Sequence, residues 1–162
     1  MPMGPSLVDP HAHQDIHDAA RAEMEFGTEI LLMSLRGQDA ATSVRLASEL
    51  LCAWRERVLT HADAEEKDVF PQVLAASPEL ASEVAALVRD HDLMRLLVDE
   101  TEQGLAREGS VTGAALGRLQ ALLHIQRLHA LYEEQTFLPQ VSDVLAQAKT
   151  PSEGAAEHWP NA

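Results

Sequence analysis

The chain has 162 residues, of which 46% are hydrophobic and only 4% aromatic, and its formal net charge at pH 7 is −14. This length is typical of one domain, and the phosphates of nucleic acids and anionic membrane surfaces repel so acidic a chain. We therefore expect a single domain with no nucleic-acid partner and no membrane partner.

Composition also indicates the fold class and the compartment. Leucine and alanine favour helices, and the scarcity of aromatic residues argues against a sheet. The first residues lack the charged start and long apolar run of a signal peptide, and no stretch approaches the roughly 18 apolar residues of a membrane span. The single cysteine, Cys52, excludes an internal disulfide. We predict a cytoplasmic all-α protein in which Cys52 is a small buried side chain.

Start and stop residues divide the chain into four predicted helices. Capping residues and prolines begin them, and glycines or prolines end or kink them. The expected helices cover residues 10–36, 39 or 42 to about 70, 78–108, and 110 or 112 to 139, or to 147 beyond a kink. The signals are Asp9-Pro10, Gly37, Asp39 or Thr42, Pro71, Ser77-Pro78, Gly109, and Ser110 or Thr112.

Short connections between long helices make neighbouring helices antiparallel. The prediction is therefore an antiparallel up-down-up-down four-helix bundle over residues 10–147. Residues 1–9 are expected to form an N-terminal arm, and residues 148–162 a flexible C-terminal tail.

Polar residues interrupt the apolar stripe of every predicted helix. The stripe of the second helix advances in steps of three and four residues, as a buried helix face requires, and then continues into His61 and Glu65. The stripes of the other helices contain His17, His91, and His129 with Glu133. A buried polar side chain costs free energy unless it has a partner. We interpret these residues as a metal site rather than as packing.

The four histidines also lie at similar distances from the two predicted hairpin turns. His17 and His61 flank the first turn, His91 and His129 flank the second, and each lies 18 to 24 residues from the glycine of its turn. Equal distances from an antiparallel turn bring residues side by side. We expect one layer of ligands at the end of the bundle away from both turns.

An internal repeat carries two of these histidines. Residues 61–73 and 129–141 are identical at seven of thirteen positions. In each copy a glutamate follows the histidine by four residues, which on a helix corresponds to about 6 Å along the axis and about 40° around it. His61 with Glu65, and His129 with Glu133, therefore face the same point, and a carboxylate can bridge two metal ions.

This order of residues resembles the hemerythrin-like (HHE) cation-binding domain over about residues 10–147. The resemblance implies a non-haem di-iron site that binds dioxygen, or that senses or reacts with oxygen, nitric oxide or peroxide. His17 and His61 would hold one iron, His91 and His129 the other, and Glu65 and Glu133 would bridge them with an oxo or hydroxo group. Zinc or manganese ions are alternatives to iron.

The chain departs from the oxygen-carrying hemerythrins, which have five histidines, His-x3-His on the third helix and a final His-x4-Asp. Here Arg95 stands four residues after His91, and Glu133 replaces the aspartate at a shorter spacing. These differences argue against reversible oxygen carriage and favour a reactive or sensing site. His13, four residues before His17, is an alternative source of a fifth histidine.

Three functions stay open: a gas- or redox-responsive di-iron protein, a di-iron enzyme with peroxidase- or catalase-like activity, and a non-catalytic metal-binding or storage protein. The chain lacks the Glu-x2-His pairs of ferritin-type sites. The remaining polar residues are expected around the site or at the surface. We predict that Glu66 and Glu134 contact the ligand residues or solvent, and that Arg21 and Arg95 pair with Glu65 or Glu133 or lie at the surface. His124 is expected to pack or to lie around the site, and Tyr132 to pack. His11 and His158 are expected to be solvated.

Overall fold

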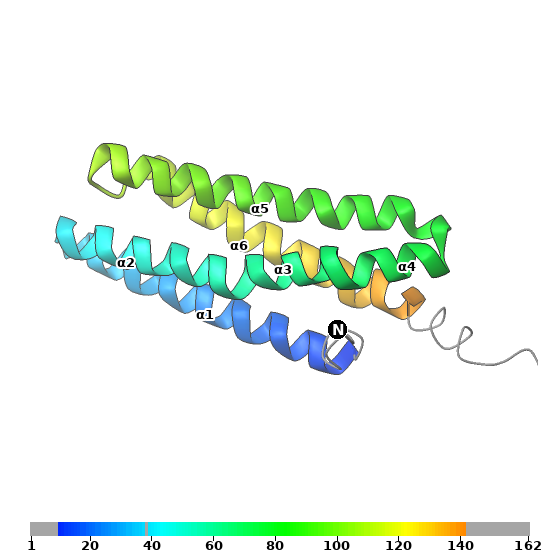
Figure 1. Cartoon of the computed structure of the whole chain (residues 1–162). Helices are drawn as coiled ribbons and strands as arrows, with labels where there is room; N and C mark the ends of the chain where they lie inside the picture. The colour runs from blue at the N-terminus through cyan, green and yellow to red at the C-terminus, as the bar shows by residue number, and fades with distance from the viewer. Residues whose placement is uncertain (1–9, 38, 142–162) are drawn as a thin grey trace, which may run out of the picture.

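The computed structural model describes residues 10–37 and 39–141, and nearly all of them are helical (Figure 1). The described chain contains no strand, so the predicted all-α four-helix bundle is confirmed. The Asp9 cap, the arm 1–9, the extension to 147, the tail 148–162 and His158 lie outside the described residues.

Four helical rods make up the bundle, and two of them contain wider π-helical turns. The first rod is α1 (Pro10–Arg36), and the third is a 3₁₀ turn (Pro78–Leu80) followed by α5 (Ala81–Glu108). The second rod consists of α2 (Ala40–Ala53), a π turn (Trp54–Leu59), α3 (Thr60–Ala64), a π turn (Glu65–Val69) and α4 (Phe70–Ala76). The fourth consists of α6 (Gly113–Tyr132), a π turn (Glu133–Phe137) and helical residues 138–141.

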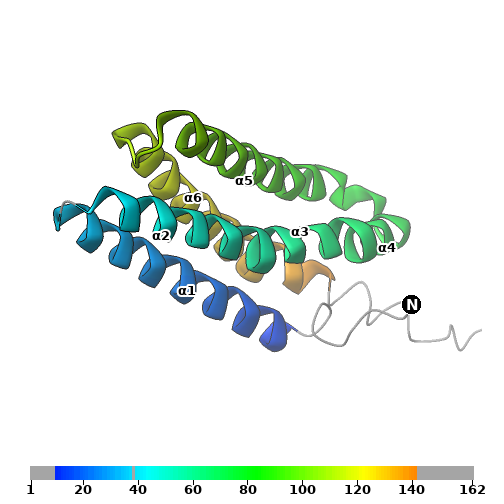
Figure 2. The same cartoon turned by 60° about the vertical axis from the view of Figure 1, so that its left-hand side comes forward.

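The rods run antiparallel, with both hairpin turns at one end of the bundle and the α4–α5 connection at the other (Figures 1 and 2). α1 packs against α2 and α6, and α5 packs against α2 and α6. No described helix is both long enough and apolar enough to cross a membrane.

Side-chain caps decide between the alternative starts of two helices. The carboxylate of Asp39 accepts a hydrogen bond from the backbone N–H of Thr42 at 3.1 Å, so the second rod begins after Asp39. The hydroxyl of Thr112 accepts one from the N–H of Ala115 at 3.2 Å, so α6 begins after Thr112. These bonds satisfy donors that the first turn of a helix leaves free.

A π turn begins at the glutamate in each copy of the internal repeat. The N–H of Phe70 bonds the carbonyl of Glu65, and the N–H of Leu138 bonds that of Glu133. One residue separates the end of each π turn from a proline, Pro71 in the first copy and Pro139 in the second. Proline lacks an N–H, and its ring collides with the carbonyl four residues earlier, so a wider turn at this point accommodates it. Pro71 consequently leaves the second rod continuous as far as Ala76.

Two apolar clusters fill the bundle, and the polar layer lies between them. One cluster extends toward the hairpin turns and includes Met24, Trp54, Val98 and Leu119. The other extends toward the α4–α5 connection and consists of Val69, Phe70, Val73, Leu80, Val84, Leu87, Phe137, Leu138 and Val141. The expectation of a layer at the end of the bundle was therefore wrong, because the doubled motif continues past the site and packs a second core.

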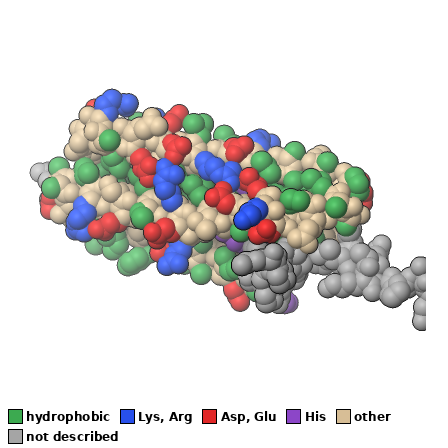
Figure 3. Space-filling view, viewed as in Figure 1, with side chains coloured by type: hydrophobic (Ala, Val, Ile, Leu, Met, Phe, Trp, Pro, Cys, Tyr) green, Lys and Arg blue, Asp and Glu red, His purple; other side chains and the backbone are tan. Residues whose placement is uncertain are grey.

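Charged side chains of both signs intermingle on the face shown in Figure 3. Among the exposed ion pairs of the described chain, the guanidinium of Arg55 donates to Asp99 at 2.6 Å and to Glu102 at 2.6 and 2.9 Å. Exposed pairs of this kind contribute little stability individually, so packing of the two apolar clusters dominates.

Three expectations about single residues were wrong. Cys52 is exposed and its thiol donates to Glu56 at 3.5 Å, because one helical step of about 100° turns it away from the buried stripe beside it. His124 and Tyr132 are also exposed. Tyr132 lies next to buried Glu133 and His124 lies two residues before buried Gln126, but both side chains are on the outer side of α6.

We predict that Gly109→Ala destabilises the protein by about 1–2 kcal/mol, because Gly109 has a φ of 61° at the end of α5 and an L-side chain is strained there. Chemical denaturation measures the effect. The matched control is Gly117→Ala within α6, where an added Cβ meets nothing within 4 Å. That substitution should be neutral or stabilising by up to about 1 kcal/mol. Equal effects at both positions would contradict the assignment.

Candidate metal centre

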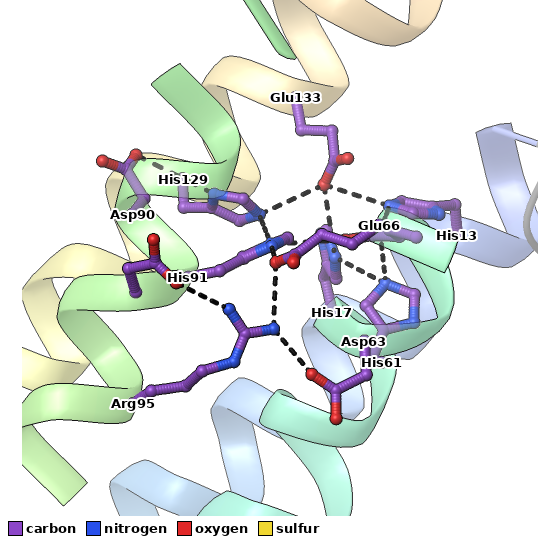
Figure 4. Close-up of polar contacts among 12 residues, drawn as sticks. His13, His17, His61, Asp63, Glu66, Asp90, His91, Arg95, His129 and Glu133 are labelled. Atoms are coloured by element: carbon purple, nitrogen blue, oxygen red, sulfur yellow. Dashed lines mark hydrogen bonds and ion pairs between the residues drawn. The ribbon is translucent and has the colours of Figure 1, made fainter. Parts of the chain in front are cut away.

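Seven polar side chains from all four rods meet in the layer between the apolar clusters (Figure 4). Six are the residues predicted from the sequence, and the seventh is His13. All are buried except His61, which is half-buried. They are His13 and His17 from α1, His61 and Glu65 from the second rod, His91 from α5, and His129 and Glu133 from the fourth rod.

The imidazoles form two close pairs. The Nε2 atoms of His17 and His61 lie 3.1 Å apart, and those of His91 and His129 also lie 3.1 Å apart. Facing nitrogens at this distance can share at most one hydrogen, which leaves nitrogen lone pairs directed into the layer. The pairs follow the two halves of the chain, one on each helical hairpin.

The Glu65 carboxylate spans the two pairs. Its Oε1 lies 2.8 Å from Nε2 of His61 and 3.1 Å from Nε2 of His13, while its Oε2 lies 3.4 Å from Nε2 of His91. Glu65 is 1% exposed, and neither oxygen has a properly directed hydrogen bond within the described chain. A buried carboxylate without directed donors is costly unless another positive centre compensates it.

Glu133 also contacts both halves of the layer, through one oxygen. Its Oε2 accepts a hydrogen bond from His13 at 3.2 Å and lies 3.5 Å from Nε2 of His129 and 3.6 Å from Nε2 of His17. The two carboxylates therefore occupy the middle of the layer with histidines around them.

A hydrogen-bond chain orients His91 from outside the layer. Its Nδ1–H donates to Glu66 at 2.7 Å, and Arg95 donates to the same carboxylate oxygen at 2.9 Å. Arg95 also donates to Asp63 at 2.6 Å and to Asp92 at 3.0 Å. This arrangement favours the tautomer whose Nε2 lone pair faces the layer. Arg95 thus pairs with Glu66 and its neighbours, and not with Glu65 or Glu133.

The other half of the repeat has a looser version of this arrangement. Oε1 of Glu134 lies 3.4 Å from Nδ1 of His17, a distance that is long for a directed hydrogen bond. Arg21 donates to Asp18 at 2.6 Å. Glu66 and Glu134 therefore both stand outside the central layer, each beside the outer nitrogen of a histidine.

Burial and the central carboxylates shift the pKa values of the metal-free site. Burial lowers the pKa of His13, but hydrogen bonds to Glu133 and Glu65 outweigh it and raise the value to about 10. Burial also lowers the pKa of His129, but its contacts with Asp90 and Glu133 outweigh burial and raise the pKa to about 9. Burial alone dominates at His17 and lowers its pKa to about 4.

The pKa values of both carboxyls move in the opposite sense. Burial raises the pKa of Glu65, but the close imidazoles of His13, His61 and His91 outweigh it and hold the pKa well below its ordinary value. Burial and the nearby charge of Glu65 raise the pKa of Glu133, yet His129 and His13 bring it down to about 2. Without metal, two imidazolium groups therefore balance two carboxylates.

The residues fit a pair of metal ions. The described side chains include two groups of potential metal ligands. Within each group, one ligand atom of every residue lies within 4.8 Å of the others, and Glu65 belongs to both groups. The first group is His13, His17, His61 and Glu65, and the second is Glu65, His91 and His129. Imidazole nitrogens and carboxylate oxygens suit iron, zinc and manganese. Metal ions would replace the protons as the charges that compensate Glu65 and Glu133.

The bundle and its layer of buried imidazoles and carboxylates define a helical metal-binding protein. The model of the hemerythrin HHE cation binding domain matches residues 11–141. This match covers most of the chain, so the chain belongs to that family. Searches among curated proteins and among solved structures return no significant match.

Sequence reasoning left His13 open and did not single out Asp63, Asp90 or Gln126. In the sequence, His13 is recognisable only as a histidine one turn before His17. Only the tertiary structure shows that its side chain is buried in the layer, where it is 1% exposed. Asp63 and Asp90 interact with ligands or their neighbours across the bundle, and such contacts have no signature in spacing along one helix.

We predict that the metal-free protein is most stable near pH 6.5. Above this pH the stabilisation from the raised pKa values of His13 and His129 is lost as the pH approaches about 9–10. Below this pH stability also falls, because His17 becomes protonated in the unfolded chain near pH 6.5 but in the folded protein only near pH 4. Thermal melting of chelator-treated protein across this range measures the profile. His13→Gln should flatten its alkaline side, and a flat wild-type profile would contradict the prediction.

Proposed function

We propose that the chain binds two iron ions in this layer and uses them to bind or react with a small molecule. His13, His17 and His61 would hold the first ion, and His91 and His129 the second. Glu65 and Glu133 would bridge the two ions. The observation that carries the proposal is the span of the Glu65 carboxylate between two imidazole pairs whose Nε2 atoms are each 3.1 Å apart.

The ligand set supports iron through its mixed nitrogen and oxygen donors and its lack of thiolates. Cys52, the only cysteine of the chain, is exposed outside the layer. The same donors accept zinc and manganese, so metal identity is a matter for measurement. A bound di-iron centre supplies one-electron redox chemistry and exchangeable positions for dioxygen, nitric oxide or peroxide.

A small pocket beside the layer supports a ligand of very few atoms. It lies on the side of the hairpin turns and offers about 20 Å³ to the centres of water-sized molecules, where roughly 10–15 Å³ holds one water. Four histidines of the layer form one wall, and the remaining walls are largely apolar. The other lining residues are Ile16, Ala20, Arg57, Val58, Ala62, Met94, Gln126 and Ala130.

The two proposed ion sites differ in their number of imidazoles. His13 stands four residues before His17, whereas buried Leu87 stands four residues before His91. The first ion would have three imidazoles and the second only two. Fewer protein ligands leave more positions for an exogenous molecule, so the second ion, held by His91 and His129, is the one proposed to take the ligand.

The bridging role of Glu65 predicts that Glu65→Ala removes both metals together. Metal content should fall from about two ions per chain toward zero, because each ion loses a ligand and the metal–folding coupling weakens. Elemental analysis after iron loading, and melting temperature with and without a chelator, provide the measurements.

Glu66→Ala is the matched control, because it removes the adjacent carboxylate, which pairs with Arg95 and contacts the outer nitrogen of His91 rather than the centre of the layer. It should retain both ions at saturating iron with affinity lowered by about 10- to 100-fold, as is usual when a partner of a ligand is lost. If the Glu65 and Glu66 variants kept equal metal and equal chelator sensitivity, the ligand assignment would be wrong.

The proposal for the second ion predicts the behaviour of His91→Ala. The iron-loaded wild type should change its visible spectrum on addition of nitric oxide or hydrogen peroxide, and the variant should lose that response. Repeated consumption of peroxide would identify an enzyme, and binding without turnover a sensor or carrier. Stoichiometric zinc with no response to either reagent would instead support a non-catalytic metal-binding protein.

A further inference from the structure

A buried glutamine stands on the inner face of α6, three residues before the second copy of the internal repeat. Gln126 precedes His129 and is 5% exposed. The residue at the matching distance before the first copy, three before His61, is Val58, which is apolar and 8% exposed. Both line the small pocket beside the metal layer. The two halves of the pocket wall therefore match in position but differ in polarity.

The side-chain oxygen of Gln126 has no hydrogen-bond partner among the described residues. A buried acceptor without a partner destabilises a fold, because the group loses its water and gains nothing in return. A valine or leucine would fill the same position without that cost. An unsatisfied amide on the wall of a pocket is therefore better explained by a molecule that binds there than by packing.

A second, larger pocket gives Gln126 a connection to the gap between α1 and α6. It offers about 170 Å³ to the centres of water-sized molecules and shares His17, Gln126 and Ala130 with the small pocket. Charged side chains make up much of its remaining wall. They are Asp18, Arg21, Arg127 and Glu134.

The two sides of the layer differ in the ion pairs that stand beside them. In one half, the ion pair of Arg95 with Glu66, at 2.9 Å, covers His91. In the other half, Arg21 pairs with Asp18, and both Arg21 and Glu134 line the larger pocket. A polar molecule that entered the larger pocket between α1 and α6 would meet Gln126 and His17, which also line the small pocket beside the other histidines.

We propose that Gln126 binds the small ligand of this site through its side-chain amide, and that this ligand carries an O–H group, as hydrogen peroxide does. The inference rests on the proposed metal centre and narrows its ligand class. An amide both accepts and donates hydrogen bonds, which matches peroxide. Nitric oxide and dioxygen have no hydrogen to donate to the side-chain oxygen of Gln126. An apolar residue such as Val58 at this position would allow them to bind equally well.

The test compares Gln126→Leu with Val58→Leu in the iron-loaded full chain. Stopped-flow absorption gives the second-order rate constant for hydrogen peroxide, and titration gives the dissociation constant for nitric oxide. Gln126→Leu should lower the peroxide constant by about 3- to 10-fold, the contribution of one hydrogen bond, and should change nitric oxide binding by less than about twofold. Val58→Leu only reduces the room in the pocket, so it should affect both probes equally.

Several outcomes would overturn the inference. Equal peroxide constants for the wild type and Gln126→Leu would do so, as would an equal loss for both probes, or a selective loss of the peroxide reaction in Val58→Leu. The melting temperature of the metal-free Gln126→Leu protein is a readout that needs no iron. It should equal or exceed that of the wild type, because an unpaired buried amide is removed, and a marked decrease would assign Gln126 to the fold instead.

Metal analysis of every variant separates this inference from the proposed function. A wild type that does not bind two ions refutes the di-iron proposal itself. A wild type with two ions, and with ligand binding that does not depend on Gln126, refutes only the inference.

Discussion

Two carboxylates buried in the middle of an apolar bundle are the constraint on which the rest of the structure depends. Glu65 and Glu133 are each 1% exposed and lie between two apolar clusters. Their charge has to be compensated inside the protein, since water is excluded. The metal-free chain does so with protonated His13 and His129, and the proposed function replaces those protons with metal ions. The same layer therefore determines both stability and chemistry.

The doubled motif supplies this layer through local backbone geometry. Each copy has a histidine, a glutamate one turn later, a π turn that begins at that glutamate, and a proline separated from the end of the turn by one residue. Apolar residues on both sides of each proline pack into the second core. One short sequence thus positions two ligands and also closes the bundle on the far side of them, so the layer is held between two packed cores rather than at a free end.

The two halves of the chain differ in the residues that surround the shared ligands. His13 in one half corresponds to Leu87 in the other, and Gln126 corresponds to Val58. Arg95 covers its half of the layer through Glu66, whereas on the other side Arg21 pairs with Asp18 beside a pocket. The shared residues of the repeat hold the proposed metals, and the differing residues surround the space in which a small ligand would bind.

The sequence by itself was enough to predict four antiparallel helices, the family resemblance, and the six side chains that meet in the layer. The helices and the six side chains follow from periodicity, caps and equal distances from the turns, which are properties of residues near one another in the chain, and the resemblance follows from the order of the histidines and glutamates. The sequence did not decide whether His13 joins the layer. It also did not predict that Cys52 is exposed or that a second core lies beyond the site. It also missed the unpaired amide of Gln126. These depend on how helices distant in sequence pack side by side, because burial and cross-helix contacts exist only once the bundle has formed.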